Sequence, residues 1–143
     1  MIRNLQYYDL HEIERQFRIL DKIDISGIEY HADRDILSLF LGVDFNGEDK
    51  KFIGLFSDNN EFLALLGYID TGQHILINSI YTNILHRFKG HASELVRYLL
   101  EVYSSRLYVA FPYTVEAAKF FSKLGFTENP EIDPIEKPYS LAT

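Results

Sequence analysis

Two hydrophobic, strand-like runs separated by one amphipathic helix constrain the fold of this chain more than any other feature. The first run is HILINSIYT (His74–Thr82) and the second is RLYVAFP (Arg106–Pro112). Between them, apolar residues recur at i, i+3, i+4, i+7, i+8 and i+11 from Ala92 to Tyr103, which places them on one face of a helix. A strand–helix–strand crossover of this kind predicts an α/β fold built around a sheet.

The rest of the chain predicts further strands and helices around this crossover. Two hydrophobic runs separated by Asp58–Asn60 have the chemistry of a β-hairpin, and Thr114 and Gly125 can cap and end a second helix. The near-continuous hydrophobicity of the runs indicates a sheet that is covered on both faces. We therefore expect one mixed α/β domain over residues 1–143. The additional elements expected are strands over residues 1–6, 51–57, 61–70 and 137–143, the last at a sheet edge, and helices over residues 9–20, 33–41 and 114–124.

Composition limits the classes of function. The chain has 143 residues and no cysteine, which excludes disulfides, thiolate metal sites and a cysteine nucleophile. Its N-terminal residues are too charged for a signal peptide, and no segment approaches the ~20 apolar residues of a membrane span. We therefore expect a cytoplasmic protein without a membrane partner. The net charge of −7 argues against a nucleic-acid partner, although residues 80–127 carry six basic and three acidic side chains.

The turn ahead of the crossover helix, HRFKGHAS (His86–Ser93), has the chemistry of an anion site. The first backbone N–H groups of a helix lack intrahelical partners, and the helix dipole adds partial positive charge there. Gly90 has no Cβ, so an anion could approach the backbone closely. Arg87 and Lys89 add full charges, and Ser93 adds a hydroxyl. A pyrophosphate group would suit this turn; the alternative is an ordinary helix start at which glycine merely permits a tight turn.

The same turn resembles a known coenzyme-binding motif. Arg87–Ala92 (RFKGHA) is similar to the acetyl-CoA motif R/Q-x-x-G-x-G/A of the GNAT superfamily of N-acetyltransferases, and it likewise follows a hydrophobic strand and opens a long helix. Downstream, AAKFFSKLGF (Ala117–Phe126) resembles the family helix A-x-x-L/F-Y-x-K-x-G-F. The order of the two motifs also fits, so the resemblance covers the whole chain. It implies a single GNAT-like domain with a mixed, mostly antiparallel central sheet flanked by helices.

This resemblance implies acetyl transfer from acetyl-CoA directly to an amine, in a ternary complex and without a covalent enzyme intermediate. Backbone N–H groups of the turn would hold the pyrophosphate, and the end of the preceding strand would pair with the pantetheine arm. The two crossover strands would splay apart to admit the thioester. No metal is expected, because the five histidines form no H-x-x-x-H pair. The coenzyme-contacting residues implied are Ile80, Tyr81, Thr82, Arg87, Phe88, Lys89, Gly90, His91, Ala92 and Ser93.

Two positions depart from the family pattern and leave the catalytic residues open. Phe121 occupies the place of the usual tyrosine general acid, and Thr114 that of a frequent asparagine. A thiolate with a pKa near ~8.5 can leave without protonation, so this loss would slow catalysis without stopping it. Tyr113 is the candidate replacement acid, or an ordinary packing tyrosine. Candidates for the base are His74 and, through a water, Asn78; each is otherwise an ordinary turn or strand residue.

The acceptor is an amine of unidentified structure, in a small molecule or a peptide. Several acidic residues between positions 21 and 35 would suit a cationic amine and could equally form a solvated surface. A rival hypothesis keeps the fold but makes the protein a weakly catalytic or non-catalytic acyl-CoA sensor or interaction module. A third is a structural or dimerising role. A homodimer through a sheet edge is also an option that the resemblance implies.

Overall fold

The computed structural model describes residues 1–5, 9, 12–13, 15–16, 50–87, 89–112 and 114–143, with only the backbone of Lys50, Asn78 and Ile84. Residues 9, 12–13 and 15–16 are helical, as predicted, and the helix predicted over residues 33–41 lies outside the described residues. The other elements begin and end close to the predicted positions. They are β1 (Ile2–Asn4), β2 (Lys50–Phe56), β3 (Phe62–Asp70), β4 (Ile75–Thr82), the 3-10 helix η2 (Ile84–His86), α3 (His91–Val102), β5 (Leu107–Ala110), α4 (Val115–Lys123), β6 (Thr127–Glu128) and β7 (Tyr139–Ala142).

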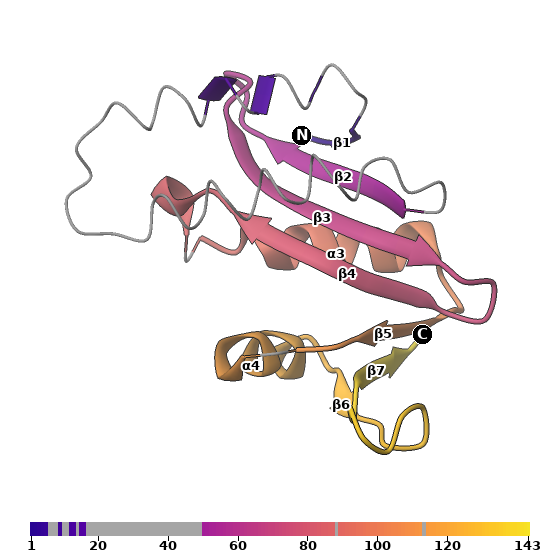
Figure 1. The fold of residues 1–143 in the computed structure, drawn as a ribbon. Helices are drawn as coiled ribbons and strands as arrows, with labels where there is room; N and C mark the ends of the chain where they lie inside the picture. The colour runs from indigo at the N-terminus through magenta and orange to yellow at the C-terminus, as the bar shows by residue number, and fades with distance from the viewer. Residues whose placement is uncertain (6–8, 10–11, 14, 17–49, 88, 113) are drawn as a thin grey trace.

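One seven-stranded sheet in the order β1-β2-β3-β4-β5-β7-β6 organises the described residues (Figure 1). Every neighbouring pair is antiparallel except β4 and β5, which the crossover through α3 makes parallel. The predicted mixed, mostly antiparallel α/β sheet is therefore confirmed. The prediction that residues 137–143 form an edge strand is wrong. After α4 the chain forms the short strand β6, which pairs with β7. The edge of the sheet is therefore β6, and β7 lies between β5 and β6.

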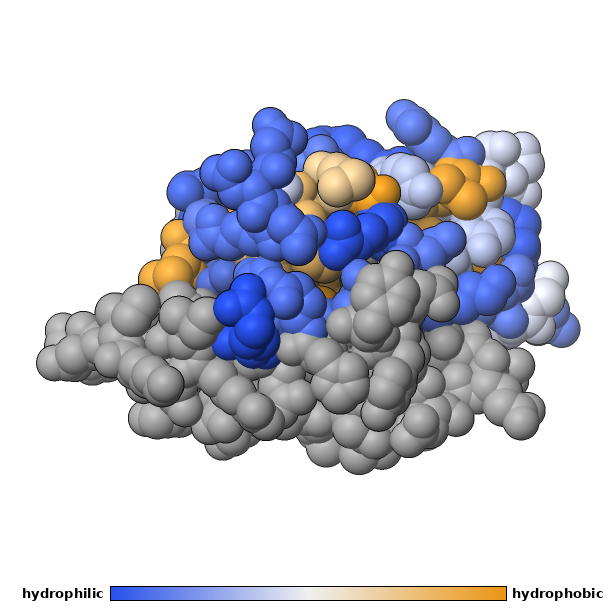
Figure 2. Space-filling model, turned by 90° about the horizontal axis from the view of Figure 1, so that it is seen from above, coloured by the Kyte–Doolittle hydropathy of each residue, from blue (hydrophilic) through white to orange (hydrophobic). Residues whose placement is uncertain are grey.

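Side chains pack on both faces of the sheet, as the hydrophobic runs predict. The helix α3 lies along one face (Figure 1), where Leu95, Val96 and Leu99 join strand residues such as Ile53 in one core. On the other face, Ile13 packs with Phe52 and other residues in a second core. Adjacent residues of one strand therefore enter opposite cores, as strand geometry requires. Seen from above, the described surface is mostly hydrophilic, with small separate hydrophobic patches (Figure 2).

Specific contacts fix both ends of α4 and the C-terminal end of α3. The hydroxyl of Thr114 accepts a hydrogen bond from the backbone N–H of Ala117 at 3.1 Å, which confirms the predicted N-cap of α4. Gly125 follows α4 with a φ of 98°, a left-handed conformation typical of a helix end. At the other helix, the buried hydroxyl of Tyr108 donates to the carbonyls of Leu99 (2.9 Å) and Tyr103 (2.6 Å). The strand β5 thereby holds the C-terminal end of α3, which sets the crossover geometry.

Candidate functional site

The two crossover strands stop pairing part-way along β4. The strands β4 and β5 pair at Ile75↔Tyr108, Leu76↔Val109 and Ile77↔Ala110, and β5 ends at Ala110. The strand β4 continues to Thr82, and the two strands diverge toward the end at which α4 begins (Figure 1). Beyond Ile77, the backbone of β4 on this side has no strand partner among the described residues. An extended ligand could therefore lie along this side of β4, where β5 no longer pairs with it.

A bulge marks the point at which the opening begins. On the β3 side, Gly67 is opposite Ser79 whereas Tyr68 is opposite Ile77, which leaves Asn78 as the extra residue. A bulge of this kind shifts the alternation of side chains by one position. Accordingly, Ile77 and Ile80 both contact the core beneath α3, although they are separated by three positions, whereas Tyr81 joins the opposite core. The strand thus bends at the point where its pairing with β5 ends.

The turn after β4 is tied to the start of β3 by Asn83, whose side chain is buried. The amide nitrogen of Asn83 donates to the carbonyl of Phe62 at 2.9 Å, and its amide oxygen accepts from the N–H of Leu85 at 3.1 Å. Its backbone N–H donates to the carbonyl of Leu63 at 2.8 Å. Asn83 therefore fixes where the chain leaves the strand and enters η2. It lies outside the coenzyme motif; an asparagine directly after a strand and ahead of a helical turn is the signal that could have found it.

A second tie joins the same turn to the β2–β3 hairpin. The Nε2 atom of His86 lies 2.7 Å from Oε1 of Glu61, and the Nε nitrogen of Arg87 donates to the carbonyl of Thr82 at 3.4 Å. The guanidinium of Arg87 therefore lies back toward the end of β4. Glu61, like Asn83, is outside the motif and was not predicted. The hairpin thus holds the segment that leads into α3.

The start of α3 is open, as an anion site requires. Gly90 is the N-cap with a φ of 80°, and it supplies no side-chain cap for the helix. A Cβ built at this position would meet nothing within 4 Å. The first intrahelical bond runs from the N–H of Glu94 to the carbonyl of Gly90 at 3.0 Å, so the N–H groups of the residues between them precede the helical ladder. Gly90 and Lys89 are both exposed. Free N–H groups, the helix dipole and a lysine side chain are therefore accessible together.

The histidine at the first position of α3 is held in its neutral form. Burial is the main cause that lowers the pKa of His91, and the positive charges of His86 and Lys89 lower it further, while Glu94 opposes them. The rings of His91 and His86 meet edge to face, with centroids 6.3 Å apart. A bound phosphate would reverse this balance, because a negative charge favours protonation of the ring.

The predicted catalytic residues are not all placed together. His74 lies in the β3–β4 turn, where its backbone bonds to Thr71, at the end of β4 remote from the opening. Asn78 is at the bulge, and only its backbone is described. Tyr113 lies outside the described residues, as does Phe88 of the coenzyme motif. Phe121 is buried, with edge contacts to the rings of Phe120 and Phe126 at 5.1 Å each.

Within the described part of the chain, no three or more His, Cys, Asp or Glu residues gather as metal ligands would. Nor is any described helix long and apolar enough to cross a membrane. The order of these elements, with a parallel pair that parts beside an open helix start, matches one family. The model of the Acetyltransferase (GNAT) family matches residues 7–126.

The chain belongs to the GNAT acetyltransferase family. Solved structures share this GNAT fold. The PaiA N-acetyltransferase of Thermoplasma acidophilum in complex with coenzyme A is 14% identical, with 100% of this chain and 98% of that chain covered and a TM-score of 0.65. Mutant forms of the spermidine/spermine N-acetyltransferase SpeG of Vibrio cholerae are 14% identical, with 99% and 93% covered and a TM-score of 0.61.

A structure of a KacTA–DNA complex also matches this GNAT domain, at 16% identity, with 76% of this chain and 80% of that chain covered and a TM-score of 0.60. No curated protein matches the sequence. At these identities the solved structures establish the fold alone.

Proposed function

We propose that this protein is an acetyl-CoA-dependent N-acetyltransferase that acts on a primary amine of a small molecule or peptide by direct transfer in a ternary complex. The observation that carries the proposal is the end of strand pairing at Ile77↔Ala110, while β4 continues to Thr82 and the chain then passes through η2 to the open helix start at Gly90. An extended coenzyme could lie along β4 beyond Ile77, where β5 no longer pairs with it, and place its pyrophosphate on the N–H groups of α3. The GNAT relatives that bind coenzyme A and acetylate polyamines support the same chemistry.

In the proposed reaction the neutral amine attacks the thioester carbonyl and the C–N bond forms; the nitrogen then gives a proton to the base, the C–S bond breaks, and CoA leaves as a thiolate that takes a proton from the acid or from water. A lysine-like amine with a pKa of ~10.4 must lose a proton at a cost of about 4.6 kcal/mol at pH 7. For an α-amino group with a pKa of ~8, which is only about one unit above pH 7, the same deprotonation costs about 1.4 kcal/mol. Asn78 at the bulge, acting through a water, is a better-placed candidate base than His74, because His74 lies at the paired end of β4. Tyr113 remains the proposed acid.

A second candidate function is an acyl-CoA sensor or interaction module, and the residue that favours it is Phe121. This residue occupies the family position of the tyrosine acid, is 6% exposed and cannot donate a proton. Binding of CoA without turnover on any amine would favour this alternative. Since a thiolate can leave unprotonated, we retain the enzyme as the first proposal.

Thermal unfolding with CoA, acetyl-CoA and ATP tests the coenzyme site. A ligand at 100 times its dissociation constant adds ~2.7 kcal/mol of stability. We expect both CoA forms to stabilise the wild type more than ATP does, and Gly90→Glu to abolish the shift because a carboxylate would enter the phosphate site. Gly72→Glu is a matched control: Gly72 has a φ of 86° and likewise nothing within 4 Å of a built Cβ. Equal CoA responses in the two variants would contradict the site.

Release of free thiol from acetyl-CoA in the presence of polyamines, aminoglycosides and peptide N-termini then separates enzyme from sensor. Turnover that Gly90→Glu removes supports the enzyme. CoA binding without turnover on this panel supports the sensor. A cytoplasmic location, the absence of a nucleic-acid partner and a sheet-edge homodimer stay predictions of this proposal.

A further inference from the structure

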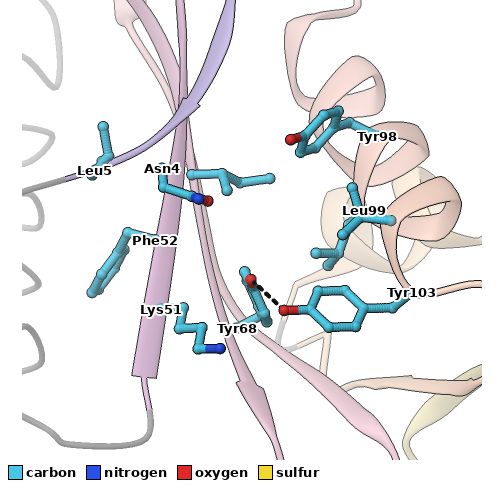
Figure 3. A pocket seen from close by; sticks show the side chains of 10 residues that line it. Asn4, Leu5, Lys51, Phe52, Tyr68, Tyr98, Leu99 and Tyr103 are labelled. Atoms are coloured by element: carbon cyan, nitrogen blue, oxygen red, sulfur yellow. Dashed lines mark hydrogen bonds between the residues drawn. The ribbon is translucent and has the colours of Figure 1, made fainter.

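A pocket of about 350 Å³ lies at the end of α3 that is remote from Gly90. Asn4, Lys51 and Tyr68 approach it from β1, β2 and β3, and Tyr98 and Tyr103 approach it from α3 and its C-cap (Figure 3). A helix of 12 residues is ~18 Å long, so this pocket is about one helix length from the proposed phosphate site. None of its lining residues belongs to the coenzyme motif. It is therefore a separate site from the opening between β4 and β5.

The polar side chains of this pocket can all donate hydrogen bonds, and that of Lys51 can only donate. Lys51 takes part in no hydrogen bond or ion pair among the described residues, and it is opposite Tyr68 in the β2–β3 register. The hydroxyls of Tyr68 and Tyr103 lie 3.1 Å apart in a hydrogen bond (Figure 3). One of their two protons makes that bond, so the other can be donated to a ligand. An ammonium group and a phenol proton side by side favour an acceptor that carries negative charge.

The phenol of Tyr68 keeps its proton at neutral pH. Burial, followed by the hydrogen bond to Tyr103, raises the pKa of Tyr68 above its usual value. Lys51 is the one basic residue among the lining residues, and none of them is acidic. The nearby carboxylate of Asp70, whose charge acts on Tyr68 and Lys51, is paired with Arg106, so the lysine adds a net positive charge at this end of the sheet in a protein whose net charge is −7.

The other walls of the pocket are apolar or aromatic. Ile53 and Leu99 are buried beneath it, and Val102 is 52% exposed at its rim, which makes Val102 one of the large exposed hydrophobic residues of the described chain. The ring of Tyr98 adds an aromatic surface on the helix side (Figure 3). A volume of this size lies within the range of small-molecule sites, which combine apolar walls with a few polar groups. A flat ring suits these walls, because aromatic rings stack or meet edge to face.

We propose that this pocket binds a small planar organic anion, with an aromatic ring between Tyr98 and Val102 and an anionic group on Lys51 and the Tyr68–Tyr103 pair. The anionic group can be a carboxylate or a phosphate, because either accepts hydrogen bonds from the same donors. Binding here leaves the coenzyme opening free, since the two sites share no residue. The site is independent of the proposed acetyl transfer.

Methyl-detected NMR of the full chain, titrated with benzoate in the presence of saturating CoA, tests the proposal. We expect saturable shifts at the methyl groups of Val102 and Ile53, which line the pocket, and none at Leu141 of β7. Benzamide, which has the shape of benzoate without its charge, should bind at least tenfold more weakly. Phenyl phosphate that binds as well as or better than benzoate supports the same site and identifies phosphate as its preferred anion.

Charge-matched variants localise the effect. Lys51→Gln should weaken benzoate binding at least tenfold while leaving CoA-induced stabilisation unchanged. Lys119→Gln, at an exposed lysine of α4, removes the same charge elsewhere and should leave benzoate affinity unchanged. The proposal is overturned if Val102 and Ile53 show no saturable shift, if benzamide binds as well as benzoate, or if Lys51→Gln binds like the wild type. Since Lys51 is exposed, its substitution should not compromise folding, and the thermal midpoint checks this.

Discussion

Gly90 acts through its backbone conformation as much as through its missing side chain. Its φ of 80° lies in the left-handed region, where a residue with a Cβ is strained by ~1–2 kcal/mol. The sequence could predict this position, because a glycine ahead of an amphipathic helix is typical of a tight turn. It could not predict the empty space around Gly90, which depends on how β3, β4 and the hairpin converge. From the sequence alone, a phosphate site and an ordinary tight turn are therefore both open, and the phosphate site stays a proposal.

His91 should make stability depend on pH in a definite direction. Its pKa in the folded protein is below the ordinary value of 6.5, so at intermediate pH the unfolded chain binds more protons than the folded one. The free energy of unfolding should therefore decrease as pH falls from about 6.5 through the lowered value. His91→Gln should remove this part of the decrease. Urea unfolding at pH 7.5 and at pH 5.5 measures it, and an unchanged pH dependence in the variant would refute the assignment.

The segment between β4 and α3 depends on Asn83 as a structural anchor. Asn83→Ala removes two side-chain hydrogen bonds and leaves the carbonyl of Phe62 without its amide donor in a buried setting. A buried group left unsatisfied costs about 1–3 kcal/mol. We expect a loss of stability of this size in urea unfolding. CoA affinity should fall as well, because the anchored turn leads directly to Gly90.

Glu61→Gln provides the matched comparison in the same turn. It keeps the shape of the side chain but removes its charge from the partly exposed contact with His86. The contact is an ion pair only when His86 is protonated, and exposed ion pairs contribute about 0–1 kcal/mol, so the loss of stability should be smaller than for Asn83→Ala. An equal or larger loss in Glu61→Gln would show that the hairpin contact, and not Asn83, anchors the turn.

The elements themselves were more predictable than their irregularities. The helix face of α3 and the Thr114 cap of α4 follow local rules of spacing and capping, and both are confirmed. The bulge at Asn78 was not predicted, although HILINSIYT contains its signal: Ile75 and Ile77 alternate, and the next isoleucine is Ile80. A change of phase within one strand indicates an inserted residue. Asn83 and Glu61 were missed because their roles depend on partners more than 20 positions away.

At the scale of the whole molecule, the strand order could be predicted only in part. The strands β2 and β3 are neighbours because a short turn joins them, and the crossover strands β4 and β5 are neighbours because consecutive strands usually lie side by side. The strand β7 could either insert between β5 and another strand or add at the edge of the sheet. Hydrophobicity does not distinguish these options, since both bury one face of the strand. The sequence therefore predicted the strand but not its position between β5 and β6.

This inserted position predicts that β7 tolerates proline poorly. Ser140 is paired with Val109 of β5 and with Thr127 of β6, and its hydroxyl accepts a hydrogen bond from Asn129 at 3.0 Å. Proline in a strand with neighbours on both sides removes a ladder hydrogen bond, and a buried backbone group left without its partner costs about 1–3 kcal/mol. Ser140→Pro should therefore lower the free energy of unfolding by at least this amount, measured in urea.

Ser140→Ala is the control, because it removes only the hydroxyl contact, for which we expect a loss of about 1 kcal/mol. Similar losses in the two variants would indicate that the backbone of β7 contributes little to the sheet. A much larger loss in Ser140→Pro would confirm its two-sided pairing as a main source of stability for this half of the molecule.

The position of β7 also determines when the sheet can be completed during synthesis on the ribosome. The strand β5 forms one wall of the proposed coenzyme opening, and its outer edge is covered only by residues 139–142. A chain made from its N-terminus exposes that edge until the whole of β7 has emerged. Until then, β5 is attached to the earlier strands through three register positions with β4. The half of the sheet that frames the opening is therefore assembled last, and a nascent chain arrested before residue 139 presents an unpaired strand edge to its neighbours on the polysome.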